Sequence, residues 1–499
     1  YLFANAGLQN LQFVVESFSG CENDTSFNLE IFELPEVAFE NLPICVNTEN
    51  TFVSQISIPE ADELVSVEWY IDELLVSTEG DLNYSFDSQG TYTILLVVST
   101  LRGCSNSFEK QIEVFSVFPE IETALISPAN NTLTTDTIVA FDWEGSSEAR
   151  YYQLSISSDS LFENEIYNSD NLLVSLDTVL LSMDYDTVFW RVLTFNHCLN
   201  MSSSEYRVLR FIDVFEKGDI IAWYKPENLI DSGGFLYKWI DNSENGFDIP
   251  QANEESRPEL EFSDEYDFPY ITYDGINDYF QLDFQQEFTQ PLSGFVVWRN
   301  NIKTNQTIFD GINVGELSYY FPYSNLDLLF LNSGGPISLQ FNKVIENNLS
   351  LSSFVANTES HLYHNNQEIG SRDIGSNGLN GITFGSRAQL DIRYFNGQIQ
   401  EFILFDGELS DSIRLEIESY LHDKYFPPVN LLYDIYVPYG FPDTTITTAS
   451  KPWFTSYQWS TGGNDTLSTL AVSEPGTYAV TVTDIFGFES SDSIEVRYP

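Results

Sequence analysis

The residues best suited to chemistry lie in the segment PYITYDGINDYFQL, residues 269–282. Asp274, Asn277 and Asp278 fall within five positions there, around Gly275. Carboxylate and amide oxygens are calcium ligands, but calcium takes roughly six to eight oxygens, so these three side chains would need help from other loops. No D-x-D-x-D-G loop occurs anywhere in the chain. The segment favours the turn of a β-hairpin, and a calcium site at Asp274, Asn277 and Asp278 is the alternative.

Carboxylate catalysis has weaker support elsewhere in the chain. A retaining glycosidase needs two carboxyl groups about 5 Å apart. ELEFSDEYD, residues 259–267, comes nearest, but its acids fall on both strand faces and in a turn. No G-x-S-x-G, P-loop or Rossmann glycine pattern occurs. We therefore expect no catalytic residues and no enzyme activity in this chain.

A metal site at the histidines of HLYH is also disfavoured. His361 and His364 are three residues apart, so on a strand they point to opposite faces. The longer run HLYHNNQEIG predicts a hairpin with Asn365 and Asn366 at its turn.

The chain is strongly acidic, with 75 acidic residues against 20 basic ones and a net charge of −55. Such a surface repels nucleic acid and anionic lipid, so neither is an expected partner. A salty or calcium-rich extracellular medium would screen this charge well. Hydrophobic residues make up 42% of the chain, enough for real cores, but no stretch approaches the ~18 apolar residues that span a bilayer. At about 150 residues per domain, the length predicts three or four domains.

Residues 1–32 repeat residues 84–115 at a constant offset of 83 without a gap. The identical positions include Gly7/Gly90, Gly20/Gly103, Cys21/Cys104 and Phe32/Phe115. YTILLVVST predicts a strand, RGC a turn and FEKQIEVF an alternating return strand. Residues 1–35 are therefore expected to be the C-terminal half of a truncated domain. A third copy of this strand–turn–strand form lies at 474–496, with Phe488 in place of the cysteine.

These copies resemble the polycystic-kidney-disease-type (PKD) immunoglobulin-like modules of bacterial surface proteins. VEWYIDELLVSTEGDLNYSFDSQGTYTILLVV has that family's order of a Trp strand, a turn and a G-T-Y strand, and YQWSTGGNDT…VSEPGTYAVTVTD matches it more closely. Within 36–117, Cys45 precedes the first core strand and Cys104 follows the penultimate one, so we expect Cys45 and Cys104 to form a disulfide. Closing that ~60-residue loop would stabilise the domain by ~4 kcal/mol. Cys21 and Cys198 would have no partner in the chain, and four reduced cysteines are the alternative.

Residues 118–215 show short strands separated by turns, which favours a β-sandwich. The strands are VAFDW, YYQLSIS and TVFWRVLTFN, the last at 187–196. The segment resembles a fibronectin type III module, with SPANN, Trp143 and FWRV in that family's places. Trp143 and Trp190 are expected to anchor the core, and the resemblance implies a spacer.

Residues 216–427 form the largest predicted unit. AWYKPENLI, WIDNSENGFD, RPEL and ITYDGINDYFQL follow in an order that resembles the concanavalin-like, laminin-G-type domain of secreted bacterial proteins. The match covers most of 219–426, with Glu244 where the family often has glycine and Tyr273 in place of phenylalanine. The resemblance implies strand, tight turn and strand across 273–282.

One helix is predicted at the end of this unit, in LSDSIRLEIESYLHDKYF, residues 409–426. Ser410 is a natural N-cap. The apolar stripe consists of Ile413, Ile417, Tyr420 and Leu421. Pro427 and Pro428 end the helix.

The sequence thus predicts an all-β chain of tandem β-sandwich modules with one short C-terminal helix in a concanavalin-like jelly roll. The expected units are a truncated Ig/PKD-like domain at 1–35, an Ig/PKD-like domain at 36–117, a fibronectin type III-like domain at 118–215, a laminin-G/concanavalin-like domain at 216–427 and an Ig/PKD-like domain at 428–499. This mixture resembles large surface adhesins that type IX secretion exports in gliding and predatory bacteria.

The resemblance implies an extracellular, non-catalytic protein at the cell surface. The laminin-G-like unit would contact a glycan or a protein, with calcium as the candidate cofactor. Two alternatives are a subunit of a self-assembling extracellular filament and the accessory region of a secreted polysaccharide hydrolase. Fold alone does not decide among them.

Overall fold

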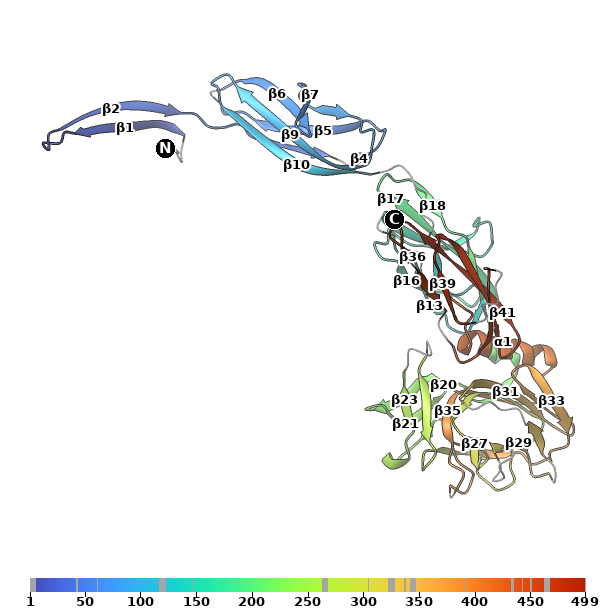
Figure 1. The fold of residues 1–499 in the computed structure, drawn as a ribbon. Coiled ribbons are helices and arrows are strands. Elements are labelled where there is room, and N and C mark those ends of the chain that lie inside the picture. Colours follow the sequence, from blue (N-terminus) through green and yellow to red (C-terminus); the bar gives the residue numbers. More distant parts are fainter. Residues whose placement is uncertain are drawn as a thin grey trace.

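β-Strands are the dominant regular structure of the described chain, which confirms the predicted all-β class (Figure 1). The computed structural model describes residues 6–41, 44–60, 62–115, 123–146, 148–262, 268–303, 305–321, 328–335, 338–341, 347–390, 392–431, 435–441, 443–448, 451–461 and 467–498. One α-helix, α1 (Asp411–Tyr425), occurs within these ranges. No helix in the described ranges has the length and apolar character needed to cross a membrane.

The N-terminal element is a hairpin of β1 (Gly7–Glu16) and β2 (Glu22–Ile31), called the first hairpin below. Gly7 faces Ile31 in this hairpin, and Gly90 faces Val114 in the hairpin of β9 and β10. Every pair in the first hairpin gives a pair in the second when 83 is added to both numbers. The sequence repeat is therefore confirmed as the same hairpin formed twice in the same register.

The first sandwich (Glu36–Phe115) packs one sheet of order β4-β10-β9-β6-β7 on another of order β3-β5-β8. Its strands are β3 (Glu36–Asn41), β4 (Ile44–Cys45), β5 (Asn50–Ser57), β6 (Leu64–Ile71), β7 (Leu74–Ser77), β8 (Leu82–Tyr84), β9 (Gly90–Thr100) and β10 (Ser105–Phe115). Alternate residues of β9, among them Ile94, Leu96 and Val98, are buried in the core around Trp69. This alternation is the period-2 burial expected of a strand with one inner face.

The second sandwich (Leu125–Phe211) has sheets of order β11-β13-β16 and β12-β19-β17-β14-β15, with β18 beside β17. Its strands are β11 (Leu125–Ser127), β12 (Thr132–Thr134), β13 (Ile138–Trp143), β14 (Ala149–Ser157), β15 (Glu165–Asn168), β16 (Leu176–Leu180), β17 (Thr187–Asn196), β18 (Met201–Ser203) and β19 (Arg207–Phe211). Trp143 and Trp190 are fully buried, so their predicted role as core anchors is confirmed.

The jelly-roll unit (Asp219–Tyr425) packs a ten-stranded sheet, whose main path is β20-β21-β23-β24-β35-β26-β31-β32-β33, on a six-stranded sheet of order β25-β34-β27-β28-β29-β30. Its elements, with the short helix η1 before it, are η1 (Val214–Lys217), β20 (Asp219–Ser232), β21 (Phe235–Asp241), β22 (Ile249–Pro250), η2 (Glu254–Ser256), β23 (Glu259–Glu261), β24 (Tyr270–Asp274), β25 (Phe280–Phe288), β26 (Leu292–Asn300), β27 (Gln306–Asp310), β28 (Ser318–Phe321), β29 (Leu329–Asn332), β30 (Leu339–Phe341), β31 (Leu349–Ala356), β32 (Ser360–His364), β33 (Gln367–Arg372), β34 (Leu379–Phe384) and β35 (Asn396–Asp406).

Strand β35 is buried on both faces. Phe402 and Leu404 point into the core between the two sheets, while Ile403 and Phe405 point to the opposite side, where α1 covers them. A strand covered on both faces reads as an unbroken apolar run, which explains the sequence FILF.

Helix α1 confirms the predicted helix in both its start and its apolar stripe. Ser410 is the N-cap, and its Oγ accepts a hydrogen bond from the Ile413 N–H at 3.4 Å. Ile417, Tyr420 and Leu421 are buried against the outer face of the ten-stranded sheet.

The C-terminal sandwich (Ile435–Arg497) has sheets of order β36-β41-β40-β38 and β37-β39. Its strands are β36 (Ile435–Tyr436), β37 (Thr444–Thr447), β38 (Phe454–Trp459), β39 (Thr469–Val472), β40 (Gly476–Asp484) and β41 (Glu489–Arg497). Gly476 faces Val496 as Gly90 faces Val114, so the third copy of the hairpin is confirmed.

The units do not follow one another in a straight row (Figure 1). One apolar cluster around α1 contains Leu133 and Ile212 from the second sandwich and its linker, together with Trp453 and Phe486 from the C-terminal sandwich. The chain therefore turns back after α1, and the C-terminal sandwich lies beside the second sandwich. The predicted unit boundaries at residues 35, 117, 215 and 427 stay predictions.

Candidate functional site

The segment at Asp274–Asp278 is a turn, as the sequence favoured. The Asp274 Oδ1 accepts hydrogen bonds from the N–H groups of Ile276 at 2.7 Å and Asn277 at 3.2 Å, and the Asp278 Oδ2 accepts from the Asp274 N–H at 2.9 Å. Gly275 has φ of 79°, which glycine adopts at no steric cost. A Cβ at this glycine would lie 2.7 Å from the Cβ of Asn396, so no larger residue fits.

The prediction of a hairpin is wrong, however, because the two flanking strands belong to different sheets. Strand β24 pairs with β23 and β35 in the ten-stranded sheet, whereas β25 pairs with β34 in the six-stranded sheet. The turn therefore carries the chain from one layer of the jelly roll to the other. Strands that pair in a hairpin and strands that belong to two different sheets show the same alternation of apolar and polar residues. The sequence pattern therefore could not distinguish a hairpin from a crossover between sheets.

Two of the three calcium candidates, Asp274 and Asp278, already use a carboxylate oxygen within the turn. Asp274 and Asp278 accept the backbone hydrogen bonds described above, and the Asn277 side-chain amide donates to the carbonyl oxygen of Glu255. The described part of the chain holds no cluster of three or more His, Cys, Asp or Glu side chains placed to bind a metal. A calcium site at Asp274, Asn277 and Asp278 stays a prediction, and at that site the Asp274 Oδ1 and the Asp278 Oδ2 would have to share or give up their backbone N–H partners.

Burial raises the pKa of Asp278 to about 7, and the charges of Asp274 and Glu259 act in the same direction, while the hydrogen bond from the Asp274 N–H opposes them. The folded protein thus keeps this proton up to about pH 7, whereas the unfolded chain loses it near pH 4. Folding stability from this group therefore falls as pH rises between these values.

We expect Asp278→Asn to remove this decrease of folding stability with rising pH. The amide oxygen can still accept from the Asp274 N–H, and the variant should gain on the order of 1 kcal/mol over the native protein between pH 4.5 and 7.5. Urea unfolding at both pH values measures this, with Asp283→Asn on the exposed side of β25 as the control. Equal pH dependence in the native protein and both variants would contradict it. Because a bound cation would lower the carboxyl pKa, repeating the titration with calcium tests the calcium prediction.

The histidines of HLYH lie on opposite faces of β32, as predicted. His361 is partly exposed and its Nδ1 lies 3.0 Å from the Glu368 Oε1, while His364 is buried and its Nδ1 lies 3.0 Å from the Ser352 Oγ. Burial lowers the pKa of His364 to about 3, so it is neutral. Asn365 and Asn366 both have positive φ at the turn, which confirms the predicted hairpin.

Within the acidic segment ELEFSDEYD, residues 263–267 lie outside the described residues.

The predicted disulfide between Cys45 and Cys104 is wrong, because Cys45 is bonded to Cys198. Cys45 faces Phe115 at the end of β10, whereas Cys104 directly precedes the start of that strand. Roughly ten residues at about 3.4 Å each put the two cysteines about 35 Å apart, far beyond the ~7 Å between Cα atoms that a disulfide allows. Cys21 and Cys104 are free thiols.

The Cys45–Cys198 disulfide joins two successive units. Cys45 belongs to β4 of the first sandwich, and Cys198 lies in the turn between β17 and β18 of the second sandwich. The rings of Phe115 and His197 stack at the same junction, with centroids 4.0 Å apart and planes 9° from parallel. Sequence spacing gives no information about which ends of two units meet, so it does not indicate Cys45 as the partner of Cys198.

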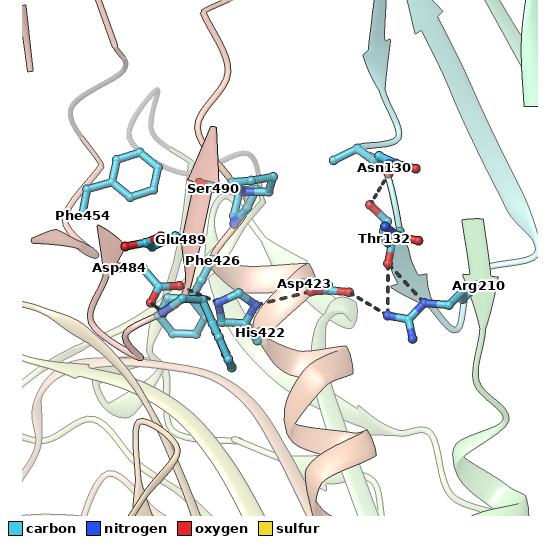
Figure 2. A pocket seen from close by; sticks show the side chains of 15 residues that line it. Asn130, Thr132, Arg210, His422, Asp423, Phe426, Phe454, Asp484, Glu489 and Ser490 are labelled. Carbon is cyan, nitrogen blue, oxygen red and sulfur yellow. Dashed lines mark hydrogen bonds and ion pairs between the residues drawn. The ribbon is translucent and has the colours of Figure 1, made fainter. Parts of the chain in front are cut away.

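The end of α1 forms a second junction, at which three units meet (Figure 2). The His422 Nε2 lies 2.7 Å from the Asp484 Oδ2 of the C-terminal sandwich. On the other side, the Asp423 Oδ2 accepts from the Leu133 N–H of the second sandwich at 2.9 Å and lies 4.0 Å from the Arg210 Nη2. One helical turn thus holds both sandwiches through polar contacts above the shared apolar cluster.

A cavity of about 290 Å³ opens beside these contacts (Figure 2). The second sandwich contributes Asn130 and Thr132 to its lining, α1 and the segment after it contribute Phe426, and the C-terminal sandwich contributes Phe454 and Glu489. Because all three units line it, the cavity exists only while they are docked.

Burial lowers the pKa of His422, but the hydrogen bonds and charges of Asp423 and Asp484 outweigh burial and raise the pKa above its usual value. The stability that this contact adds is therefore complete below the unfolded value near 6.5 and is lost as pH rises through the folded pKa. The junction should thus loosen on the alkaline side.

We expect His422→Gln to weaken docking of the C-terminal sandwich at pH 6 by about 1.5–3 kcal/mol, the range for a hydrogen bond to a charged group. At pH 9 the variant and the native protein should differ less, because the positive charge of the native imidazole is lost as pH rises through its folded pKa. Limited proteolysis and urea unfolding at both pH values measure the difference. His361→Gln, on the outer face of β32, is the control, and a deficit that does not change with pH would contradict the charge argument.

A buried ionic network fixes α1 to the ten-stranded sheet. The Glu401 side chain in β35 is fully buried and accepts four hydrogen bonds. Its Oε1 accepts from the Trp223 Nε1 at 2.7 Å and the Tyr420 Oη at 3.0 Å, and its Oε2 accepts from the Lys424 Nζ and the Tyr425 Oη, both at 2.7 Å. The Lys424 Nζ also lies 3.0 Å from the Glu227 Oε1. Every oxygen lone pair of the buried acid thus has a donor, which offsets the cost of its burial.

No family model matches this sequence. No curated protein matches it either. Solved structures share parts of the fold. The fibronectin(III)-like modules of Clostridium thermocellum CbhA are 10% identical over 36% of this chain and 93% of theirs, with a TM-score of 0.26. The PKD1 domain of Vibrio anguillarum Epp is 24% identical over 17% of this chain and 96% of its own, with a TM-score of 0.15.

The ligand-binding domain of botulinum neurotoxin serotype D, solved with N-acetylneuraminic acid, is 14% identical over 54% of this chain and 71% of its own, with a TM-score of 0.30. A sialidase is also among the matches. These likenesses are partial and do not separate binding modules from enzymes.

Proposed function

We propose that this protein is a non-catalytic segment of an extracellular surface adhesin or fibre. One observation carries the proposal: the Cys45–Cys198 disulfide ties two successive sandwiches together instead of closing a loop within one core. Disulfides persist in oxidising surroundings outside the cytosol. A covalent bond between modules holds their mutual angle, which suits a protein that presents a surface at a distance from its anchor.

The second junction, at the end of α1, also fixes the positions of the units relative to one another, but without a covalent bond. It joins the second sandwich, the jelly-roll unit and the C-terminal sandwich through one apolar cluster and through the contacts of His422 and Asp423. The jelly-roll unit is thereby held at one end of the assembly, with β21 and β23 at the periphery of that unit (Figure 1). Export by type IX secretion remains the expectation from the mixture of modules.

The contact surface that we propose on the jelly-roll unit is the group of exposed aromatic side chains on and beside β21 and β23. Phe235 and Tyr237 flank the buried Leu236 and both lie on the outer face, and Phe262 after β23 is 72% exposed. The Arg257 guanidinium lies 5.8 Å from the centre of the Tyr237 ring. Exposed aromatic rings offer flat apolar area with a polar rim, which suits the C–H face of a sugar ring or a protein partner.

The experiment is a glycan array probed with the whole chain, with and without calcium. The double variant Phe235→Ala/Tyr237→Ala should lose at least about tenfold in binding, since each exposed aromatic contact is worth on the order of 1 kcal/mol. Leu173→Ala, at a more exposed apolar residue of the second sandwich, is the control. An array without any bound glycan, or binding that survives the double variant, would overturn the glycan contact.

The filament alternative is favoured by one specific observation, the first hairpin. Its strands pair only with each other within the described residues, and Phe13, Val15 and Phe27 on it are more than half exposed. An apolar strand surface is a template for pairing with a further strand, and in a filament the neighbouring chain would supply that strand. Since the chain carries a net charge of −55, salt or calcium would be needed for assembly. Light scattering that stays monomeric across salt and calcium would remove this alternative.

A further inference from the structure

An acidic side chain, Glu259 of β23, lies beside the exposed aromatic residues of the jelly-roll unit. We infer that this carboxylate determines the class of ligand: the surface takes a glycan that presents hydroxyl or amino groups there, and it repels a glycan that presents carboxylate or sulfate groups. Glu259 is thus a specificity-determining residue. The inference rests on the proposed glycan contact and names the chemistry of its ligand.

Glu259 lies next to Phe235 because the two residues face each other in the ladder of β21 and β23. The Leu236 N–H donates to the Pro258 carbonyl oxygen at 2.9 Å, and the corresponding bond on the other side of the facing residues is 2.7 Å long. These two bonds flank Phe235 and Glu259, which therefore form a non-hydrogen-bonded pair, the closer kind in an antiparallel ladder. The two side chains point to the same face of the sheet, with their Cβ atoms about 4.5–5.5 Å apart.

The Glu259 carboxylate is available to a ligand. The residue is exposed, and within the described ranges its side chain makes no hydrogen bond or ion pair. Glu261 on the same strand differs, because it is only partly exposed and accepts a hydrogen bond from the Thr272 hydroxyl at 3.1 Å. The ring of Phe235 and the carboxylate of Glu259 thus form one continuous exposed surface.

A ring with a carboxylate beside it matches the two kinds of surface on a sugar. The C–H face of the sugar packs on the ring of Phe235 or Tyr237, and a hydroxyl or amino group at the edge of the sugar donates to Glu259. A carboxylate only accepts hydrogen bonds, so it offers no donor to an acidic sugar, and the two like charges repel each other. The surface therefore suits glycans without acidic groups.

The basic side chains near these rings do not offset the charge of Glu259. The Arg257 Nε donates to the Gln251 carbonyl oxygen at 3.0 Å, and its Nη1 lies 3.7 Å from the Glu254 Oε1. The Lys238 Nζ lies 2.5 Å from the Asp248 Oδ2. Each of these two basic residues thus already faces an acid. Since the whole chain carries a net charge of −55, its long-range field also repels an acidic glycan.

The test uses the whole chain and three oligosaccharides of equal length and the same β-1,4 linkage, made of glucose, glucosamine or glucuronic acid. Calorimetric titration at pH 6 and low salt gives the three affinities. We expect the glucuronic acid oligomer to bind at least about fivefold more weakly than the glucose oligomer, and the glucosamine oligomer at least about fivefold more tightly. This is the effect of one unit charge about 4 Å away in water. High salt should bring the three affinities closer together.

Two variants separate the charge of Glu259 from its hydrogen bond. Glu259→Gln still offers an oxygen to a hydroxyl group but has no charge, so the three affinities should fall within about twofold of one another. Glu259→Lys should reverse the order, with the glucuronic acid oligomer bound most tightly. Glu109→Gln, at an exposed position of β10 in the first sandwich, removes the same charge from another unit and should leave the order unchanged.

The outcomes separate this inference from the proposed function. Suppose that the oligomers bind and that Phe235→Ala/Tyr237→Ala abolishes binding. A glucuronic acid oligomer that then binds as tightly as the glucose oligomer, or an order that Glu259→Gln and Glu109→Gln change equally, overturns the role of Glu259 and leaves the glycan contact standing. If none of the three oligomers binds, or if binding survives the double variant, the glycan contact fails and the inference fails with it.

Discussion

Glu401→Gln should lower the free energy of unfolding of the jelly-roll unit by about 3–5 kcal/mol, the cost of breaking a buried ionic network. The side chain is fully buried, and its four partners all approach as donors. Glutamine offers one oxygen and one N–H₂ group, so two of the donors would face another donor. Tyrosine hydroxyls can turn to accept, but Trp223 and Lys424 cannot.

The charge balance points in the same direction. Burial raises the pKa of Glu401, but the charge and hydrogen bond of Lys424, with those of Tyr425 and Trp223, outweigh burial and hold the pKa below its usual value. The stability from this carboxylate is present above its unfolded pKa of about 4.3 and is lost as pH falls through the folded value. The deficit of the glutamine variant should therefore be large at pH 7 and should shrink in acid.

Urea unfolding of the whole chain, followed by tryptophan fluorescence, measures this difference because Trp223 and Trp453 lie in the cluster around α1. The control is Glu495→Gln on β41, whose partner Arg497 at 3.3 Å is itself 40% exposed and whose loss should cost less than about 1 kcal/mol. If both variants unfold like the native protein, Glu401 is not what holds α1 on the sheet.

The local structure of this chain was largely predictable because its signals are local. The offset-83 repeat predicted two hairpins, and the structure gives them the same register from Gly7 and Gly90 onwards. The helix after Ser410 followed from an N-cap and an i, i+4, i+7 stripe. Each of these features depends on residues within one element or on one repeated pattern.

The contacts between units were not predictable, because the spacing of residues along the chain does not indicate which ends of two units are in contact. Cys45 bonds to a residue 153 positions away in another unit, and Trp453 joins a core that begins with Leu133. One pattern in the sequence does indicate the buried ionic network. In GQIQEFILFDGEL, Glu401 lies next to the unbroken apolar run of β35. Such a run indicates a strand covered on both faces, and an acid within it needs buried donors.

Cys198→Ser should free the angle between the first and second sandwiches and lower the free energy of unfolding. The disulfide closes a segment of 153 residues, for which the chain-entropy model gives a stabilisation of about 5 kcal/mol. Without it, the visible contacts at this junction include the stacked rings of Phe115 and His197. An aromatic pair is worth about 0.5–1.5 kcal/mol, too little to hold two units at a fixed angle.

Small-angle X-ray scattering should show a broader distribution of intramolecular distances for Cys198→Ser than for the native protein, and reductant should change the native protein but not the variant. Cys104→Ser and Cys21→Ser are matched controls, since both thiols are free and neither change should alter shape or stability. A non-reduced digest must yield the peptide that joins Cys45 to Cys198. A peptide joining Cys45 to Cys104 would contradict the arrangement, because it would require the two ends of β10 to meet.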